Sequence, residues 1–371
     1  MRILQLGKFY PVSGGVEKVM VDLQQGLSQQ GLICDMLCCH AEVGALRRVI
    51  EVAPNAHIIC DKSLLKKFST MFSIQMMVEL RRICCNYDII HVHHPDPMAA
   101  FALLLSGYKG KVVVHWHSDI LSQRLLLQLY MPLQNWMLRR ADVVVGTTPV
   151  YIQQSPHLQA VQEKCTYLPI GIRPVMWNDS EVAHIRAQYP GKKIIFSLGR
   201  LVYYKGFEYL IDAARQLFDD YMILIGGSGE LKSKLQQQID DNALSSKVKL
   251  LGRVSDAELP NYFRACDLFC LSSVQKTEAF AIVQVEAMSC GRPVVATRIP
   301  ESGVSWVNAH GISGVNVPVR DSGALAEAFV SILENKTLYK RYSEGARHRF
   351  EQIFQFDEMI EKCLNIYRGL S

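Results

Sequence analysis

The sequence predicts an α/β protein made of two doubly wound, Rossmann-like domains that face a central cleft. Three observations support this prediction. The chain has 371 residues, whereas one domain usually holds about 100–200. Short apolar runs rich in β-branched residues alternate with amphipathic stretches, which is typical of parallel sheets covered by helices on both faces. The alternation occurs twice, and prolines and glycines interrupt it near residues 169–192.

The first series of apolar runs predicts the strands of a domain spanning residues 1–172. These strands are Met1–Leu6, Ile33–Cys38, His57–Cys60, Ile89–Val92, Lys111–His115, Val143–Gly146 and Cys165–Leu168. Amphipathic spacing predicts helices between them, among others at Val16–Gln29 and Leu64–Cys85. The carboxyl ends of these strands should border the cleft, because open α/β sheets bind ligands there.

The second series predicts a domain spanning residues 173–350. Its strands are Lys193–Ser197, Tyr221–Ile225, Val248–Leu250, Leu268–Leu271 and Pro293–Thr297. Its helices include Phe207–Leu217, Glu230–Asn242, Ala257–Cys266 and Phe280–Met288. Residues 351–371 form a further amphipathic stretch, which predicts a terminal helix.

Composition excludes several classes of protein. Hydrophobic residues make up 49% and charged residues 20%, which is globular and rules out wholesale disorder. The net charge of +5 is too small for a dedicated nucleic-acid binder. The eleven cysteines show no Cys-x-x-Cys spacing, so we expect free, mostly buried thiols in a reducing cytoplasm. We expect neither a secretion signal nor a membrane-spanning helix.

A glycine loop, Ser13-Gly14-Gly15-Val16-Glu17, follows the first strand and opens a helix. Glycines let backbone N–H groups approach an anion, and a helix N-terminus favours negative charge. The motif is neither the dinucleotide fingerprint nor a Walker A loop. A plain strand-to-helix turn would explain it equally well.

A basic loop, Gly199-Arg200…Lys205-Gly206, directly follows the first strand of the second domain. Two cations five residues apart at a strand's carboxyl end could bind a diphosphate together. The arginine would donate two parallel hydrogen bonds, and the lysine would act as a compact positive charge. A solvated basic turn is the simpler interpretation of this loop taken alone.

Two carboxylates, Glu278 and Glu286, stand eight residues apart around an apolar core. Such a pair suits the vicinal hydroxyls of a sugar and a ribose. The alternative is a helix cap at Glu278 and a surface Glu286. The apolar residues beside Glu286, including Val285 and Ala287, would desolvate its carboxylate unless it has a partner.

Five histidines, His91, His93, His94, His115 and His117, cluster at two predicted strand ends. No carboxylate–histidine spacing such as H-E-x-x-H occurs, so we predict no metal site here. His93 and His115 alternate with apolar residues, which predicts positions in the core or on the sheet face. His117 closes its strand before Ser118 and Asp119, which makes it the best candidate for a substrate contact.

Together these motifs resemble the retaining GT-B glycosyltransferases of family 4, which include sucrose synthase-like enzymes and mannosyltransferases. Glu278 and Glu286 match the family's E-x7-E signature, and MSCGRPVVA at residues 288–296 resembles its "EAMACGKPVVA" stretch. The basic loop matches its diphosphate clamp, and Gly14-Gly15 matches its N-terminal glycine loop. The resemblance covers essentially the whole chain. Ala281 departs from it, because many members have glycine there.

The resemblance implies a role for each site residue. Arg200 and Lys205 would hold the donor diphosphate, and Gly15 would donate its backbone N–H to the distal phosphate. Glu278 would bind sugar hydroxyls, Glu286 the ribose, and His117 the donor sugar. The resemblance also implies that residues 351–371 cross back to the first domain. The remaining donor-binding positions that it implies are Gly14, Arg253 and Val254 beside the base, and Phe280, Ala281, Ile282 and Val283.

The expected activity is transfer of a hexose, GDP-mannose being the first-choice donor and UDP-sugars the next, to a lipid-linked saccharide of bacterial surface polysaccharide. No D-x-D motif occurs, so we expect no cofactor and no divalent metal. A nucleotide-sugar 2-epimerase and a non-catalytic nucleotide-sugar-binding protein remain alternatives. A nicotinamide dehydrogenase, suggested by Gly227-Ser228-Gly229 alone, is a weaker one.

The charge distribution suggests where the acceptor is met. Residues 1–172 hold 16 Lys/Arg and 12 Asp/Glu, whereas the rest hold 24 and 23. Residues 61–82 are basic and apolar, which is typical of a surface that docks on anionic membrane. A core helix with solvated basic ends is the alternative. We therefore expect a cytoplasmic protein, peripheral on the cytoplasmic face of the inner membrane if residues 61–82 dock.

Overall fold

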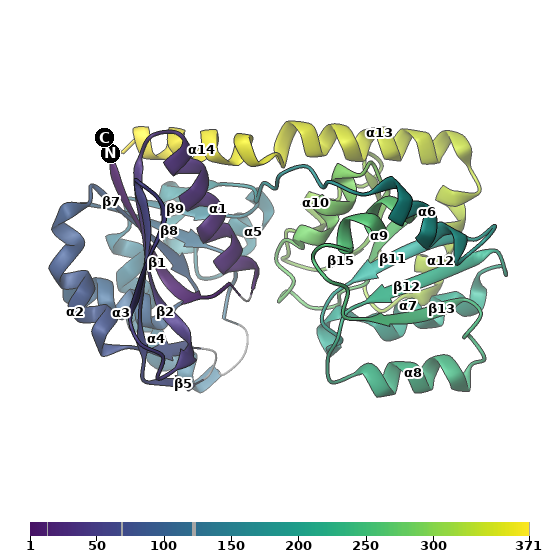
Figure 1. Ribbon diagram of the computed structural model, residues 1–371, viewed down its shortest axis with the longest axis horizontal. Coiled ribbons are helices and arrows are strands. Elements are labelled where there is room, and N and C mark those ends of the chain that lie inside the picture. Colours follow the sequence, from purple (N-terminus) through teal and green to yellow (C-terminus); the bar gives the residue numbers. More distant parts are fainter. Residues whose placement is uncertain (13, 68–69, 121–123, 371) are drawn as a thin grey trace. The chain divides into compact units, whose positions relative to one another are not determined.

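The computed structural model describes residues 1–12, 14–67, 70–120 and 124–370 (Figure 1). Its contacts divide the chain into two compact units. The first unit contains Met1–Ile170 together with the tail from Phe356 onward, and the second contains Gly171–Gln355. The final helix therefore belongs to the first unit, although nearly two hundred residues of the second unit separate it from the rest in sequence.

The first unit is an eight-stranded sheet with helices around it (Figure 1). Its strands are β1 (Arg2–Tyr10), β2 (Ile33–Val43), β3 (Arg48–Ala53), β4 (Ala56–Ser63), β7 (Ile89–His94), β8 (Lys111–Trp116), β9 (Val143–Gly146) and β10 (Cys165–Tyr167). Its helices are α1 (Gly15–Gln29), α2 (Ile74–Ile83), α3 (Pro97–Ser106), α4 (Arg124–Arg140), α5 (Pro149–Gln154) and α14 (Phe356–Arg368). A separate hairpin pairs β5 (Leu65–Lys67) with β6 (Thr70–Phe72).

The strand order β10-β9-β8-β7-β1-β2-β4-β3 places the switch point of the sheet between β1 and β7. From β1 the chain runs outward through β2 and β4, and then returns to the other side of β1. The connections after β1 and β7 consequently lead to opposite sides of the sheet, and ligands of open α/β sheets bind at such switch points. All pairs in this sheet are parallel except β3 with β4.

The second unit is a six-stranded parallel sheet in the order β13-β12-β11-β14-β15-β16. Its strands are β11 (Lys193–Leu198), β12 (Tyr221–Gly226), β13 (Val248–Gly252), β14 (Leu268–Leu271), β15 (Val294–Arg298) and β16 (Gly314–Pro318). Its helices are α6 (Asp179–Ala187), α7 (Phe207–Ala213), α8 (Lys232–Asp241), α9 (Leu259–Ala265), α10 (Ile282–Ser289), α11 (Val304–Val307), α12 (Ser322–Leu333) and α13 (Lys336–Ile353). The switch point lies between β11 and β14.

The helix predicted over Leu64–Cys85 is wrong in its first half. The backbone N–H of Leu64 donates to the Phe72 carbonyl over 2.8 Å, so this segment forms the β5–β6 hairpin. The Ser73 side chain then accepts from the N–H of Met76 over 3.1 Å, which caps α2 and starts it at Ile74. Strands β3 and β16 also lie outside the predicted set.

Buried apolar side chains fill both units, as the sequence predicts. In the second unit the largest fully buried side chains include Tyr221, Phe207 and Phe329, and in the first Trp116 and Tyr151. All eleven cysteines are free, and most are buried, as expected for the thiols themselves. Among the described residues, no helix combines the length and the apolar composition that crossing a bilayer requires.

Candidate functional site

The switch point of the second sheet brings Lys205 and Glu278 together. Lys205 lies on the loop after β11, and Glu278 lies on the loop after β14. The Lys205 ammonium is 2.5 Å from Glu278 Oε2, and the Ser273 hydroxyl donates to the same oxygen over 2.9 Å. Their side chains are only 11% and 12% exposed. A partly desolvated ion pair at a switch point is a polar site prepared for a ligand.

Glycine allows the two loops to approach so closely. Gly206 has a φ of +64°, and a Cβ at this position would lie 2.3 Å from the Ser272 carbonyl oxygen. Only glycine adopts this conformation without strain and leaves room for that carbonyl. The contact is fixed by two further hydrogen bonds, from Ser272 Oγ to the Lys205 carbonyl (2.9 Å) and from the Val274 N–H to the Tyr204 carbonyl (2.8 Å).

Arg200 lies on the same loop as Lys205. It is exposed, and its Nη2 donates to the Tyr204 hydroxyl over 3.2 Å. A Cβ at Gly199 would lie 3.0 Å from Lys205 Cε, so the lysine stem lies against this glycine. The structure therefore gathers both cations of the predicted clamp at the carboxyl end of β11.

Gly227 and Gly229 serve packing. A Cβ at Gly227 would lie 1.8 Å from the Gly199 carbonyl oxygen, and one at Gly229 would lie 2.5 Å from that of Leu201. The loops after β11 and β12 thus touch backbone to backbone. This contact explains the G-x-G motif without any dinucleotide, and it removes the feature that suggested a dehydrogenase.

The turn before α10 carries most of the remaining predicted donor positions. Ala281 has φ +63° and ψ 77°, so the helix begins at Ile282 and not at Phe280 as predicted. A left-handed residue here explains why glycine is common at this position in the family that the sequence resembles. The Phe280 ring packs against Phe354 with centroids 5.9 Å apart, while Val283 lies half-buried in the first turn.

Glu286 and the β13 loop complete the second unit's site residues. Glu286 lies in α10 and is half-buried, as its apolar neighbours suggested. Arg253 and Val254 directly follow β13, where Arg253 is exposed. A Cβ at Gly226 would lie 3.1 Å from Val254 Cγ2, so Val254 packs over the end of β12.

The switch point of the first sheet contains the glycine loop. Gly14 precedes α1 in an extended conformation, and Gly15 is the first helical residue; Ser13 of the same motif lies outside the described residues. A Cβ at Gly14 would lie 2.7 Å from Glu17 Oε2. The Glu17 carboxylate therefore lies beside Gly14 at the N-terminus of α1.

A half-buried charge cluster that sequence analysis missed lies at the ends of β1 and β7. The Lys8 ammonium donates to the Pro95 carbonyl, and the Lys8 N–H donates to Asp96 Oδ2 over 2.5 Å. Burial lowers the pKa of Lys8 and raises the pKa values of Asp96 and Glu17. One lysine in a terminal apolar strand gives little sequence signal for such a cluster.

Four histidine rings stack on one face of β7 and β8. His91 and His93 share that face because side chains alternate along a strand, and His93 is the register partner of His115. His93 and His115 are fully buried, which confirms the prediction for both. His117, just after β8, is 6% exposed, and its Nε2 lies 2.9 Å from His93 Nδ1. Burial holds the pKa values of all four well below the usual range, that of His115 at about 3.

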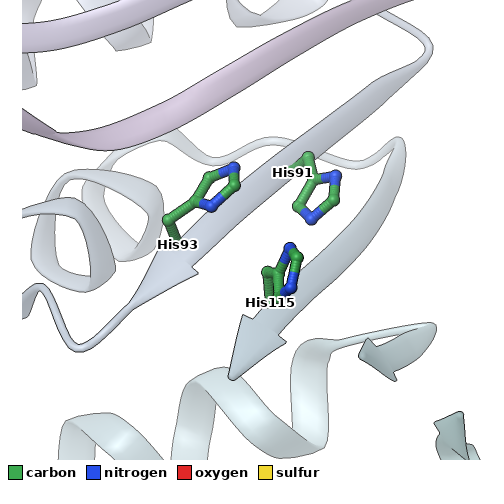
Figure 2. A group of neighbouring side chains, drawn as sticks. All are labelled: His91, His93 and His115. Carbon is green, nitrogen blue, oxygen red and sulfur yellow. The ribbon is translucent and has the colours of Figure 1, made fainter. Parts of the chain in front are cut away.

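One ring nitrogen from each of His91, His93 and His115 lies within 4.8 Å of the other two (Figure 2). Their ring planes differ by only 11°, 26° and 32°, so their in-plane lone pairs do not converge on one point. Both nitrogens of His93 are already hydrogen-bonded, to Gln5 Oε1 and to His117. The group is thus arranged as a stack and not as a ligand set.

Two glycosyltransferase families match the chain. The family described as Glycosyltransferase Family 4 matches residues 13–174, and that described as Glycosyl transferases group 1 matches residues 180–349. O-antigen chain mannosyltransferase C of Escherichia coli is 32% identical over 375 residues, which cover 100% of this chain and 99% of that protein. D-rhamnosyltransferase WbpZ of Pseudomonas aeruginosa is 28% identical, covering 95% and 92%.

Solved structures show the same fold. Sucrose-phosphate synthase from Thermosynechococcus elongatus superimposes with a TM-score of 0.81 at 19% identity, over 100% of this chain and 99% of that one. Anabaena HepE in complex with UDP and glucose gives 0.79 at 21% identity, over 100% of both. The chain therefore belongs to the family 4 glycosyltransferases and has their GT-B fold of two Rossmann-like domains.

Proposed function

We propose that this enzyme transfers a hexose, mannose from GDP-mannose in the first instance, to a lipid-linked saccharide during O-antigen or related surface polysaccharide synthesis. The contact between Lys205 and Glu278 at the second switch point carries this proposal, because one locus then offers a cation and a carboxylate. The printed names of two relatives, an O-antigen chain mannosyltransferase and a D-rhamnosyltransferase, support the class of product. A phosphatidyl-myo-inositol mannosyltransferase of Mycobacterium leprae, 27% identical, supports a lipid acceptor.

The chemistry follows from where charge develops. Breaking the sugar–phosphate bond leaves positive character on the sugar and negative charge on the diphosphate. Lys205 and Arg200 would stabilise the diphosphate, aided by the backbone N–H groups that open α10. Glu278 would accept hydrogen bonds from sugar hydroxyls, and in the resting enzyme it holds the Lys205 ammonium in place. Glu286 would bind the ribose.

Because two cations stand at the carboxyl end of β11, we infer that they take the role a divalent metal would have. From the resemblance to the retaining enzymes of family 4, we also infer that transfer retains the anomeric configuration. The glycine loop would bind the distal phosphate through the N–H of Gly15. His117 would contact the donor sugar. Arg253 and Val254 would border the base.

A screen of nucleotide sugars tests the proposed donor. Each is incubated with the full chain, and release of nucleoside diphosphate is measured with and without a lipid-linked acceptor. We expect turnover with GDP-mannose that rises on adding acceptor. Conversion of donor alone into a 2-epimer would instead establish the epimerase. Binding without turnover of any donor would establish a non-catalytic binding protein.

We further propose that the surface formed by the β5–β6 hairpin, α2 and α3 docks on anionic membrane, as expected for residues 61–82, of which 68–69 lie outside the described residues. Exposed apolar side chains gather there: Leu64, Leu65, Phe72, Ile74, Val78, Phe101, Leu104 and Leu105. Lys66, Arg81 and Arg82 are exposed on the same elements, and Lys62 is exposed near the end of β4. Apolar side chains enter the headgroup boundary while cations attract anionic lipid.

Liposome flotation tests the docking surface. We expect the protein to float with vesicles rich in anionic lipid and not with neutral ones, and Ile74→Ser with Val78→Ser to abolish flotation. Phe218→Ser is the matched control, because Phe218 is 63% exposed against 60% for Ile74 but lies in the second unit. Negligible binding to both vesicle types would contradict the proposal.

A further inference from the structure

A buried chain of hydrogen bonds runs from the last helix of the protein to His117. The hydroxyl oxygen of Tyr367, in α14, is 2.5 Å from His91 Nδ1. The same oxygen accepts a hydrogen bond from Gln5 Nε2 over 3.4 Å. Gln5 Oε1 lies 2.6 Å from His93 Nε2, and His93 Nδ1 lies 2.9 Å from His117 Nε2. Gln5, His93 and Tyr367 are completely buried.

α14 can pack closely against α1 because α1 has a glycine, Gly26, at their contact. A Cβ at Gly26 would lie 2.2 Å from Ile360 Cδ1 and 3.0 Å from the Phe356 ring. The close approach seats Tyr367 against Gln5 of β1. A residue near the end of the sequence thus becomes part of the interior of the first unit.

The direction of each hydrogen bond can be deduced in turn. Gln5 donates its amide N–H to Tyr367, so its carbonyl oxygen faces His93 and can only accept. His93 Nε2 must therefore carry the proton. Burial and the neighbouring histidines lower the pKa of His93 well below its usual value, so the ring is neutral and its Nδ1 is an acceptor. His117 Nε2 must then be the donor in the last bond.

We propose that Gln5, His93 and Tyr367 are positioning residues that hold His117 in one tautomer, with its proton on Nε2 and a lone pair on Nδ1. The proposal rests on the proposed role of His117 toward the donor sugar. His117 Nδ1 receives no hydrogen bond from the residues that the structure describes. In this tautomer it can accept a hydrogen bond from a sugar hydroxyl, whereas the other tautomer would present an N–H there.

The tautomer can be observed directly by NMR of the full chain labelled with ¹⁵N-histidine. Correlation of ring carbon-bound protons with both nitrogens distinguishes a protonated from an unprotonated nitrogen, and comparison with His117→Asn assigns the signal. We expect His117 with its proton on Nε2. In Gln5→Leu the acceptor for His93 is lost, so we expect the His117 proton to shift, wholly or partly, to Nδ1.

Tyr367→Phe is the gentler variant, because it removes only the hydroxyl that orients the Gln5 amide. We expect it to give a mixture of His117 tautomers and to lower kcat by roughly 10–100-fold, by analogy with the loss of a partner that orients a metal-ligating histidine, with little change in donor KM. Tyr108→Phe is the matched control, because Tyr108 is also buried in the first unit and its hydroxyl donates to the Tyr87 carbonyl over 3.0 Å. It should leave both the tautomer and kcat unchanged.

Finding the His117 proton on Nδ1 in the wild type would overturn the inference, and so would finding it still wholly on Nε2 in Gln5→Leu. A tautomer that shifts without any change in kcat would leave the hydrogen-bond chain established and would instead overturn the assignment of His117 to the donor sugar. A shift with a fall in kcat supports both.

Discussion

Acid should destabilise the first unit through its buried histidines. Burial lowers the pKa values of five of them, so they remain neutral in the folded protein below the pH at which an exposed histidine is protonated. These residues are His91, His93, His94, His115 and His117. In the unfolded chain these histidines are protonated with a pKa near 6.5, whereas in the folded protein they stay neutral. Lowering the pH from 7 to 5.5 therefore favours the unfolded chain, and the free energy of unfolding falls.

The magnitude follows from proton linkage. Between pH 7 and 5.5 each histidine costs about 1.3 kcal/mol of unfolding free energy, so five cost about 6 kcal/mol. Buried carboxyls oppose this, because burial raises the pKa of Asp61 to about 6 and also raises those of Asp96 and Glu17. Asp61 offsets about 0.8 kcal/mol of this loss, and Asp96 and Glu17 each offset at most about 2 kcal/mol. The free energy of unfolding of the first unit should therefore fall by a net amount of about 1.5–5.5 kcal/mol. That is a large fraction of a typical domain stability of ~5–15 kcal/mol.

Hydrogen exchange measured in increasing urea follows the two units separately within the full chain. Peptides from β7 and β8 report on the first unit, and peptides from β11 and β12 on the second. We expect the urea midpoint of the first unit to fall between pH 7 and 5.5. In His115→Gln the fall should shrink by about 1.3 kcal/mol, because one proton fewer is bound on unfolding.

His184→Gln is the control, since it replaces an exposed histidine of the second unit. An equal pH dependence of the first unit in wild type and His115→Gln would refute the reasoning. So would a first unit whose urea midpoint is constant over this pH interval.

Three further predictions concern the second unit and the metal requirement. Lys205→Ala or Glu278→Gln should lower transfer by roughly 100–1,000-fold or more with folding intact, as judged by circular dichroism; near-normal turnover in either would remove the site assignment. Ala281→Gly should raise the unfolding free energy by up to about 1 kcal/mol, because glycine relieves the strain of a left-handed residue; a lower urea midpoint would contradict this. Activity should survive EDTA; full loss that Mg²⁺ restores would show that the cations do not replace a metal.

Local patterns were sufficient for much of the fold. Strand and helix periodicities, repeated on either side of the break near Pro169–Lys192, predicted the two Rossmann-like domains, which the structure and the comparisons confirm. The strand end before Arg200 and Lys205 also predicted a diphosphate clamp on that loop, whereas the grouping of these cations with Glu278 was implied by the resemblance to family 4. The hairpin at Leu65–Phe72 was missed, because its apolar side chains fit helical spacing equally well.

The sequence by itself determined the alternating elements, the glycine positions and the residue types of the donor site, because these depend on contacts between near neighbours and on the chemistry of single side chains. Only the tertiary structure decided which residues meet. Lys205 and Glu278 are 73 residues apart and His91 and Tyr367 are 276 apart. Such contacts follow from strand order and helix packing, so no local pattern encodes them.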